Sequence, residues 1–254
     1  MTQTRRRVLA ALAIATAVAS SSHAPVDAAP DGMPRVPRLM YWAWERPEDL
    51  RRIGAGAGVA FLAATYQIRG DRIDVAMRHQ PLEVNPSTPL MAVVRIETRL
   101  SDRVTLDGAA QHRLATSIAS VRMQPGVIAL QIDFDAVKSE RPFYRDLLIG
   151  IRRAIGAFPL SMTALASWCM DDDWIEGLPV DEAVPMLFRM GPVNDAFADA
   201  GVRARMHAPA CAGAVGVSTD EPTPVLRGSR RTYIFHPTSW TDDALARAAT
   251  EVMR

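Results

Sequence analysis

Apolar runs of strand length alternate with helix-periodic runs along most of the chain. About eight such runs are bounded by polar or turn residues, and they cover residues 38–44, 58–66, 89–97, 127–134, 160–168, 182–190, 212–217 and 232–235. The runs are continuously apolar instead of alternating, which is typical of parallel strands that are covered on both faces. Residues 67–77 predict a hairpin insertion around Arg69-Gly70-Asp71.

Helical periodicity fills several of the gaps between these strands. Apolar residues recur at helical spacing over residues 106–123, 142–156 and 241–252, and shorter helices are expected over residues 45–53 and 193–200. Strands that alternate with helices predict one α/β domain, and the expected fold is a (β/α)8-type, TIM-like barrel over residues 37–254. A distorted or incomplete barrel and an open doubly wound sheet are the alternatives, because some units lack a convincing helix.

The N-terminal region has the pattern of an export signal. Residues 5–7 are arginines, and the apolar residues 8–19 that follow are too few for a stop-transfer helix. We expect cleavage after Ala28, which makes residues 1–28 a signal peptide and residues 29–36 a short, flexible mature N-terminus. Residues 4–9 also resemble a twin-arginine signal, so both export routes are open. Either route predicts a periplasmic or extracellular protein, and no second long apolar segment predicts a membrane span.

Charge and cysteine content narrow the class of partner and the compartment. The formal net charge is +1, and no basic block with interleaved aromatic residues occurs beyond residues 227–231. We therefore expect no nucleic-acid partner. The chain contains two cysteines, Cys169 and Cys211. An even number in an exported protein predicts one disulfide, and two separate buried thiols are the alternative.

Two carboxylates end the apolar run of residues 127–132. Asp133 and Asp135 share one face of the predicted strand, and Phe134 faces the other way. The carboxyl ends of barrel strands form the face that carries the active site. Other polar and aromatic residues at expected strand ends are Trp44, Tyr66, Arg95, Trp168, Arg189 and Glu221.

This mixture of residues predicts a carbohydrate site. Paired carboxylates perform acid, base or nucleophile chemistry at a glycosidic bond, and aromatic faces stack on sugar rings. Asp135 is the expected general acid, Glu221 the base or nucleophile, and Asp133 a residue that tunes the donor. The expected substrate-binding residues are Trp44, Trp168, Arg95, Arg189 and Tyr66.

Less specific interpretations stand beside this one. The same barrel could bind a glycan or serve envelope assembly without catalysis. The two aspartates could chiefly neutralise Arg95 or Arg189 inside the barrel, since a buried arginine needs an anionic partner. Glu221 also lies in a sequence that fits a plain turn.

No cofactor or metal is expected. The acids at residues 171–173 fit a solvated loop or a helix start better than a metal site, and the histidines lack ligand spacing. No Gly-x-Ser-x-Gly elbow is present, which disfavours a serine hydrolase. The glycines of residues 54–58 precede a strand instead of following one, which argues against a dinucleotide loop.

Several segments in combination resemble one exported bacterial family of unknown function, domain of unknown function 3142. The segments that carry the resemblance are residues 95–97, 131–135, 160–169, 180–186 and 216–222. Together they place the resemblance over about residues 38–240. It implies a barrel of the glycoside-hydrolase type and an exported protein. It implies no activity, and no residue role is carried over from it.

Overall fold

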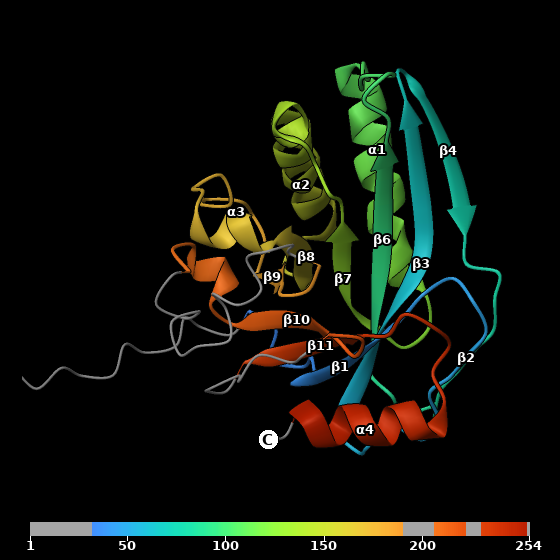
Figure 1. Ribbon diagram of the computed structural model, residues 1–254. Coiled ribbons are helices and arrows are strands. Elements are labelled where there is room, and N and C mark those ends of the chain that lie inside the picture. Colours follow the sequence, from blue (N-terminus) through green and yellow to red (C-terminus); the bar gives the residue numbers. More distant parts are fainter. Residues whose placement is uncertain (1–31, 190–205, 222–229, 253–254) are drawn as a thin grey trace, which may run out of the picture.

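The computed structural model (Figure 1) describes residues 32–189, 206–221 and 230–252. The predicted signal peptide over residues 1–28 and the helix expected over residues 193–200 lie outside these ranges. Eight parallel strands follow one another around a barrel: β1 (Leu39–Ala43), β3 (Ala57–Arg69), β6 (Leu90–Thr98), β7 (Val127–Asp133), β8 (Leu160–Leu165), β9 (Glu182–Met186), β10 (Ala214–Ser218) and β11 (Arg231–Phe235). Strand β1 pairs with both β11 and β3, so the sheet is closed. The predicted TIM-like barrel is confirmed.

The predicted hairpin is present and extends the barrel wall. Strand β3 continues to Arg69 and pairs antiparallel with β4 (Arg72–Met77), which lies beside it on the outside of the sheet (Figure 1). A short ribbon of β2 (Glu48–Asp49) and β5 (Leu82–Glu83) stands where the sequence predicts a helix over residues 45–53. That helix prediction is wrong.

Side-chain bonds explain why the segment after β1 is extended. The Arg78 guanidinium donates to the carbonyls of Trp44 and Arg46, at 2.6 and 2.7 Å. The buried Glu48 carboxylate accepts from the backbone amide of Trp240 at 2.8 Å. The bonds from Arg78 occupy two carbonyls that a helix would need for its own ladder, and the Glu48 bond ties the segment to the chain after β11, so together they outweigh the local preference.

Helices cover the outside of the barrel, and those described are α1 (Gly108–Ser120), α2 (Arg141–Ile155), the short α3 (Ala166–Met170) and α4 (Asp242–Val252), with 3-10 turns η1 (Val121–Met123), η2 (Lys138–Glu140) and η4 (Pro209–Cys211). Asp107 caps α1 by accepting from the amide of Ala110. Helices α1 and α2 stand side by side against β6 and β7 (Figure 1). A Cβ at Gly150 of α2 would meet Ala115 of α1 at 2.9 Å, so only glycine allows this close approach.

Strand alternation divides the core into two layers. One set of residues, including Tyr41 and Ile132, faces the helices. The other set, including Met40, Trp42 and Met91, fills the barrel interior. The fully buried Trp42 stacks on Phe235 with ring centroids 4.4 Å apart. The interior is therefore a packed core and not a pore, as in other barrels of this size.

The end of the barrel at the strand N-termini is closed by the chain that precedes β1. Met33 and Val36 are buried and join the interior cluster. Their carbonyls accept hydrogen bonds from Arg231, at 3.1 and 3.2 Å. The sequence places residues 29–36 in a flexible stretch, whereas the described part of it, from residue 32, is packed against the barrel.

A buried polar cluster lies directly above this closing segment. Glu182 of β9 and Arg231 of β11 form an ion pair in which both side chains are 4 % exposed. The Glu182 carboxylate also accepts from the Tyr233 hydroxyl at 2.7 Å and from Ser161 at 3.1 Å. Burial raises the pKa of Glu182, and the positive charge of Arg231 opposes that rise. Sequence reasoning did not identify this pair.

Candidate functional site

A pocket of about 460 Å³ opens at the carboxyl ends of the strands, where a barrel fold carries its chemistry. Its lining mixes charged, aromatic and aliphatic residues: Trp44, Arg95, Asp133, Asp135, Leu165, Ala166, Ser167, Asp171, Met186, Phe188, Arg189 and Phe235. The structure thus brings together five of the predicted site residues, namely Trp44, Arg95, Asp133, Asp135 and Arg189.

Asp133 forms the fixed floor of the pocket. It is the last residue of β7 and is buried. One carboxylate oxygen lies 2.6 Å from the Arg95 guanidinium of β6, and the other accepts from the Thr163 hydroxyl of β8 at 2.7 Å. Neighbouring strands in register supply both partners, so the barrel itself sets the geometry. Asp133 therefore neutralises Arg95, as one of the alternative interpretations requires.

Asp135 stands above this pair at the mouth of the pocket. Its side chain is 51 % exposed, and its carboxylate lies 4.0 Å from the Arg95 guanidinium. Desolvation against the pocket wall raises the pKa of Asp135, the charge of Asp133 raises it further, and Arg95 lowers it. Asp135 therefore combines access to a ligand with an increased tendency to hold a proton, which is what a general acid requires.

Phe134 explains why the two aspartates face inward together. Its ring is buried in the helix layer, 5.1 Å from Tyr144 and 6.3 Å from Phe143 of α2. This anchor continues the alternation of β7 beyond its last paired residue. Asp133 and Asp135 therefore both lie on the barrel side, as the strand period predicts.

An aromatic wall lies across the pocket from the aspartates. Trp44 follows β1 and packs against Trp42 and Phe235, with ring centroids at 5.4 and 6.3 Å. Phe188 packs on Phe235 at 4.9 Å. Flat apolar faces of this kind can stack on a sugar ring. The sequence predicted this role for Trp44 but did not identify Phe188 or Phe235.

A second pocket of about 290 Å³ adjoins the first. The two share four lining residues, Trp44, Phe188, Arg189 and Phe235. The second pocket is otherwise lined by Arg46, Ser218, His236 and Pro237. A ligand longer than one sugar unit can therefore extend from one pocket into the other.

Arg189 and Glu221 are in contact, but through the backbone of Arg189 and not through its side chain. Strand β9 ends at Met186, so Arg189 lies in the loop that follows and not in an apolar strand. Its backbone has a φ of 54°, the single positive value for a non-glycine residue in the described ranges. The Glu221 carboxylate accepts from the Arg189 backbone amide at 2.9 and 3.1 Å. Glu221 lines neither pocket, and the Arg189 guanidinium is 3.7 Å from Asp220.

Trp168 and Tyr66 lie away from the pocket. Strand β8 ends at Leu165 and the chain turns into α3, which buries Trp168 edge-on against Trp174 with centroids 5.0 Å apart. Tyr66 lies on the helix-facing side of β3 and hydrogen-bonds Ser117 of α1 at 2.8 Å. Both residues were placed at strand ends from the sequence, but β8 is shorter and β3 longer than the apolar runs suggest.

Two of the acids at residues 171–173 have different roles. Asp171 lines the main pocket, which sequence reasoning missed. Asp172 binds Arg141 at 2.6 Å and the amide of Trp174 at 2.9 Å. Within the described residues, no group of three or more His, Cys, Asp or Glu side chains could hold a metal ion.

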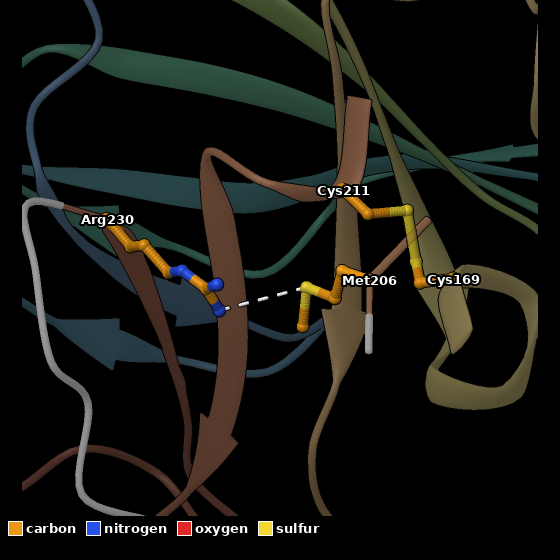
Figure 2. Close-up of a disulfide and its surroundings, with 4 residues drawn as sticks. All are labelled: Cys169, Met206, Cys211 and Arg230. Carbon is orange, nitrogen blue, oxygen red and sulfur yellow. Dashed lines mark hydrogen bonds between the residues drawn. A yellow bond between two sulfur atoms is a disulfide. The ribbon is translucent and has the colours of Figure 1, made fainter. Parts of the chain in front are cut away.

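The predicted disulfide between Cys169 and Cys211 is confirmed. It joins α3 to η4 across 42 residues, with the Cα atoms 6.0 Å apart. Figure 2 shows it beside Met206, whose sulfur accepts a weak hydrogen bond from Arg230 at 3.7 Å. None of the helices in the described ranges has the length and apolar character that crossing a bilayer requires.

Comparison with known proteins supports the barrel fold. The structure is similar to that of a protein provisionally named Chitinase A from Streptomyces coelicolor, with a TM-score of 0.55 and 11 % identity. The match covers 84 % of this chain and 94 % of that one. No protein-family model matches the chain, and no curated protein matches it by sequence, so neither supports the resemblance to domain of unknown function 3142. At this identity the likeness shows the fold alone, a closed α/β barrel.

Proposed function

We propose that this is an exported carbohydrate-active protein that binds a glycan in the main pocket and hydrolyses a glycosidic bond. The observation that carries the proposal is the placement of Asp135. Its half-exposed carboxyl group, with a raised pKa, stands above the fixed Asp133–Arg95 pair and opposite Trp44. A general acid and an aromatic face at one concave site are part of what a glycosidase needs, and a second carboxylate completes the set.

In this proposal the residues have distinct roles. Asp135 gives its proton to the leaving oxygen of the glycosidic bond. Burial and the negative charge of Asp133 keep the pKa of Asp135 raised, and Arg95 opposes part of that rise. Trp44 supplies the face on which a sugar ring stacks. Activity should fall as the pH rises through the raised pKa of Asp135, because the acid is then ionised.

A hydrolytic mechanism also requires a second carboxylate at a suitable distance from Asp135. Glu221 is proposed as the base or nucleophile, and its carboxylate would then have to leave the Arg189 amide that it now accepts from. It would need to lie roughly 5 Å from Asp135 for retention, or roughly 6.5–9.5 Å for inversion.

The position of Glu221 favours a second candidate function. With that carboxylate turned to the Arg189 backbone, the same pocket could bind a glycan, or serve assembly of the cell envelope, without cleaving it. Both functions share the ligand and the pocket. They differ in whether the bound glycan is cleaved, a step for which only the first function needs Asp135.

Export belongs to both versions of the proposal. The disulfide supports it, because such bonds persist in oxidising compartments. The pattern of residues 1–28 supports it independently. The partner is a glycan, and neither version involves nucleic acid.

The test compares the wild type with Asp135→Asn on a panel of bacterial cell-wall and exopolysaccharide substrates. Asp243→Asn is the matched control, since Asp243 is an exposed residue of α4 that lines neither pocket. Hydrolysis by the wild type and the control, but not by Asp135→Asn, supports the enzyme. Saturable glycan binding that survives Asp135→Asn, without hydrolysis by any form, supports the binding protein. No binding and no hydrolysis across the panel overturns both.

A further inference from the structure

The second pocket differs from the main pocket in its charge. The described lining of the main pocket includes three carboxylates, Asp133, Asp135 and Asp171, and two arginines, Arg95 and Arg189. The described residues that line the second pocket include none, while they include the two arginines Arg46 and Arg189. A ligand that spans both pockets therefore meets a more positive environment in the second.

Arg46 contributes positive charge but has little freedom to bind a ligand. Its Nε atom donates to the buried Glu48 carboxylate at 2.7 Å. Its terminal nitrogens donate to the carbonyls of His236, at 2.8 Å, of Pro237, at 2.9 Å, and of Thr238. These bonds turn three carbonyl oxygens after β11 toward Arg46, so that arginine mainly shapes the pocket wall.

Arg189 is held in the opposite way, by its backbone and not by its side chain. The amide donates to both oxygens of Glu221, which helps to hold the left-handed conformation that non-glycine residues rarely adopt. The guanidinium is 68 % exposed, and its ion pair with Asp220 is longer than a hydrogen bond. Asp220 itself accepts from the Ser218 hydroxyl. The exposed guanidinium of Arg189 therefore lies beside both pockets, and its long contact with Asp220 is one that a ligand anion could replace.

We propose that the second pocket binds the carboxylate of an acidic sugar residue, with Arg189 as the specificity-determining group. A guanidinium matches a carboxylate with two parallel hydrogen bonds, a geometry that a lysine does not provide. The acidic residue would be the neighbour of the sugar that stacks on Trp44, because that ring belongs to both pockets. This inference rests on the proposed glycan ligand and names its chemical class.

The experiment measures binding of paired probes by isothermal titration calorimetry. Oligogalacturonate, oligomannuronate and hyaluronan oligosaccharides are each compared with the carboxyl-reduced form of the same oligosaccharide. For at least one pair, the wild type is expected to bind the acidic form about tenfold more tightly than the reduced form at low salt. The preference should shrink as salt is added, because this site is partly open to solvent.

Three variants of the full chain test the role of Arg189. Arg189→Gln should bring the acidic-to-reduced affinity ratio to about one, and Arg189→Lys should keep only part of it. Arg247→Gln, on the exposed face of α4, is the matched control and should keep the wild-type ratio. Circular dichroism confirms that each variant is folded.

The outcomes separate this inference from the proposed function. Equal affinity for acidic and reduced forms, or a preference that survives in Arg189→Gln, overturns the acidic-sugar inference and leaves glycan binding intact. Absence of binding to every acidic and neutral oligosaccharide overturns both. A tenfold preference that is lost in Arg189→Gln and kept in Arg247→Gln supports the inference.

Discussion

The two ends of the barrel each contain an acid paired with an arginine, yet they are built for different purposes. At the closed end, Glu182 and Arg231 are shut away from solvent, and Tyr233 adds a further bond. At the open end, Asp133 and Arg95 form a similar pair, but Asp135 stands beside them half exposed and 4.0 Å from the arginine. An internal ion pair is therefore not a mark of function by itself. The distinguishing feature is a further acid that reaches solvent and is not fully paired.

The largest effect is expected at the closed end. Arg231→Met leaves the Glu182 carboxylate buried without its cation and should lower the free energy of unfolding by about 3–5 kcal/mol. Urea denaturation followed by circular dichroism measures this loss. Adding Glu182→Gln to Arg231→Met should recover part of it, since the unpaired charge is then gone. A loss below about 1 kcal/mol for Arg231→Met would show that the closed end does not depend on this pair.

The next effect concerns chemistry at the open end. Asp135→Asn keeps the shape of the side chain but cannot donate a carboxyl proton, so hydrolysis should fall by about 10²–10⁴-fold. Initial rates on the best substrate of the panel measure the change, and thermal melting shows whether the fold is kept. If the variant melts far below the wild type, Asp135 has a structural role like that of Glu182 and Arg231. The proposed difference between the two ends of the barrel would then be wrong.

The disulfide tests a third feature, the link between η4 and α3, the short helix that also supplies Ala166 and Ser167 to the main pocket. Replacing Cys169 and Cys211 together by serine should cost about 2–4 kcal/mol of stability, because the bond closes a long loop of the unfolded chain. Asp135 and Trp44 follow other strands, β7 and β1, and only Ala166, Ser167 and Asp171 of the pocket lining are near Cys169, so glycan affinity per folded molecule should fall less than stability does. Denaturation with and without a reductant gives the same comparison for the wild type.

The smallest effect is a dependence of stability on pH. The folded protein holds the Asp135 proton more tightly than the unfolded chain does, because the pKa is raised from the ordinary value of 3.8. The unfolded chain therefore binds fewer protons in that window, and stability falls as the pH rises from 3.8 through the raised pKa. Asp135→Asn removes this loss, so its melting temperature at pH 7 should be higher by about 2 °C. The advantage should vanish below pH 3.8, and a lower melting temperature at pH 7 would contradict the assignment.

Much of the barrel could be predicted because its strands are buried on both faces. Continuous apolar runs such as residues 127–132 leave little doubt about strand type. The alternation within that run also placed Asp133 and Asp135 on the same side. The errors in the predicted strands lie at the strand ends. The apolar run that begins at Leu160 continues into α3, and hydropathy does not distinguish a strand from a helical turn there. Trp168 was therefore assigned to the pocket although it lies in the helix layer.

The predictions from the sequence that were wrong concern features that depend on contacts between distant segments. The extended form of residues 45–53 depends on Arg78 and Trp240, and the closing role of Met33 depends on Arg231. No local pattern encodes these pairings. Glu221 was recognised as an acid near a strand end, but its direction toward the Arg189 amide could not be inferred without the loop geometry. Phe188 and Phe235 gave only a weak indication, since Phe188 lies inside one predicted apolar run and Phe235 ends another.

The closing segment before β1 also decides how the molecule can be oriented on a support. Gly32 packs against Asp181, just ahead of β9, at the barrel end opposite the pocket. A Cβ at Gly32 would meet the Asp181 side chain at 2.8 Å, so the backbone is seated tightly there. An affinity handle or surface linkage joined ahead of this residue would start from the sealed end. Glycan arrays and biosensor chips that use such a linkage would then present the mouth of the barrel to the analyte.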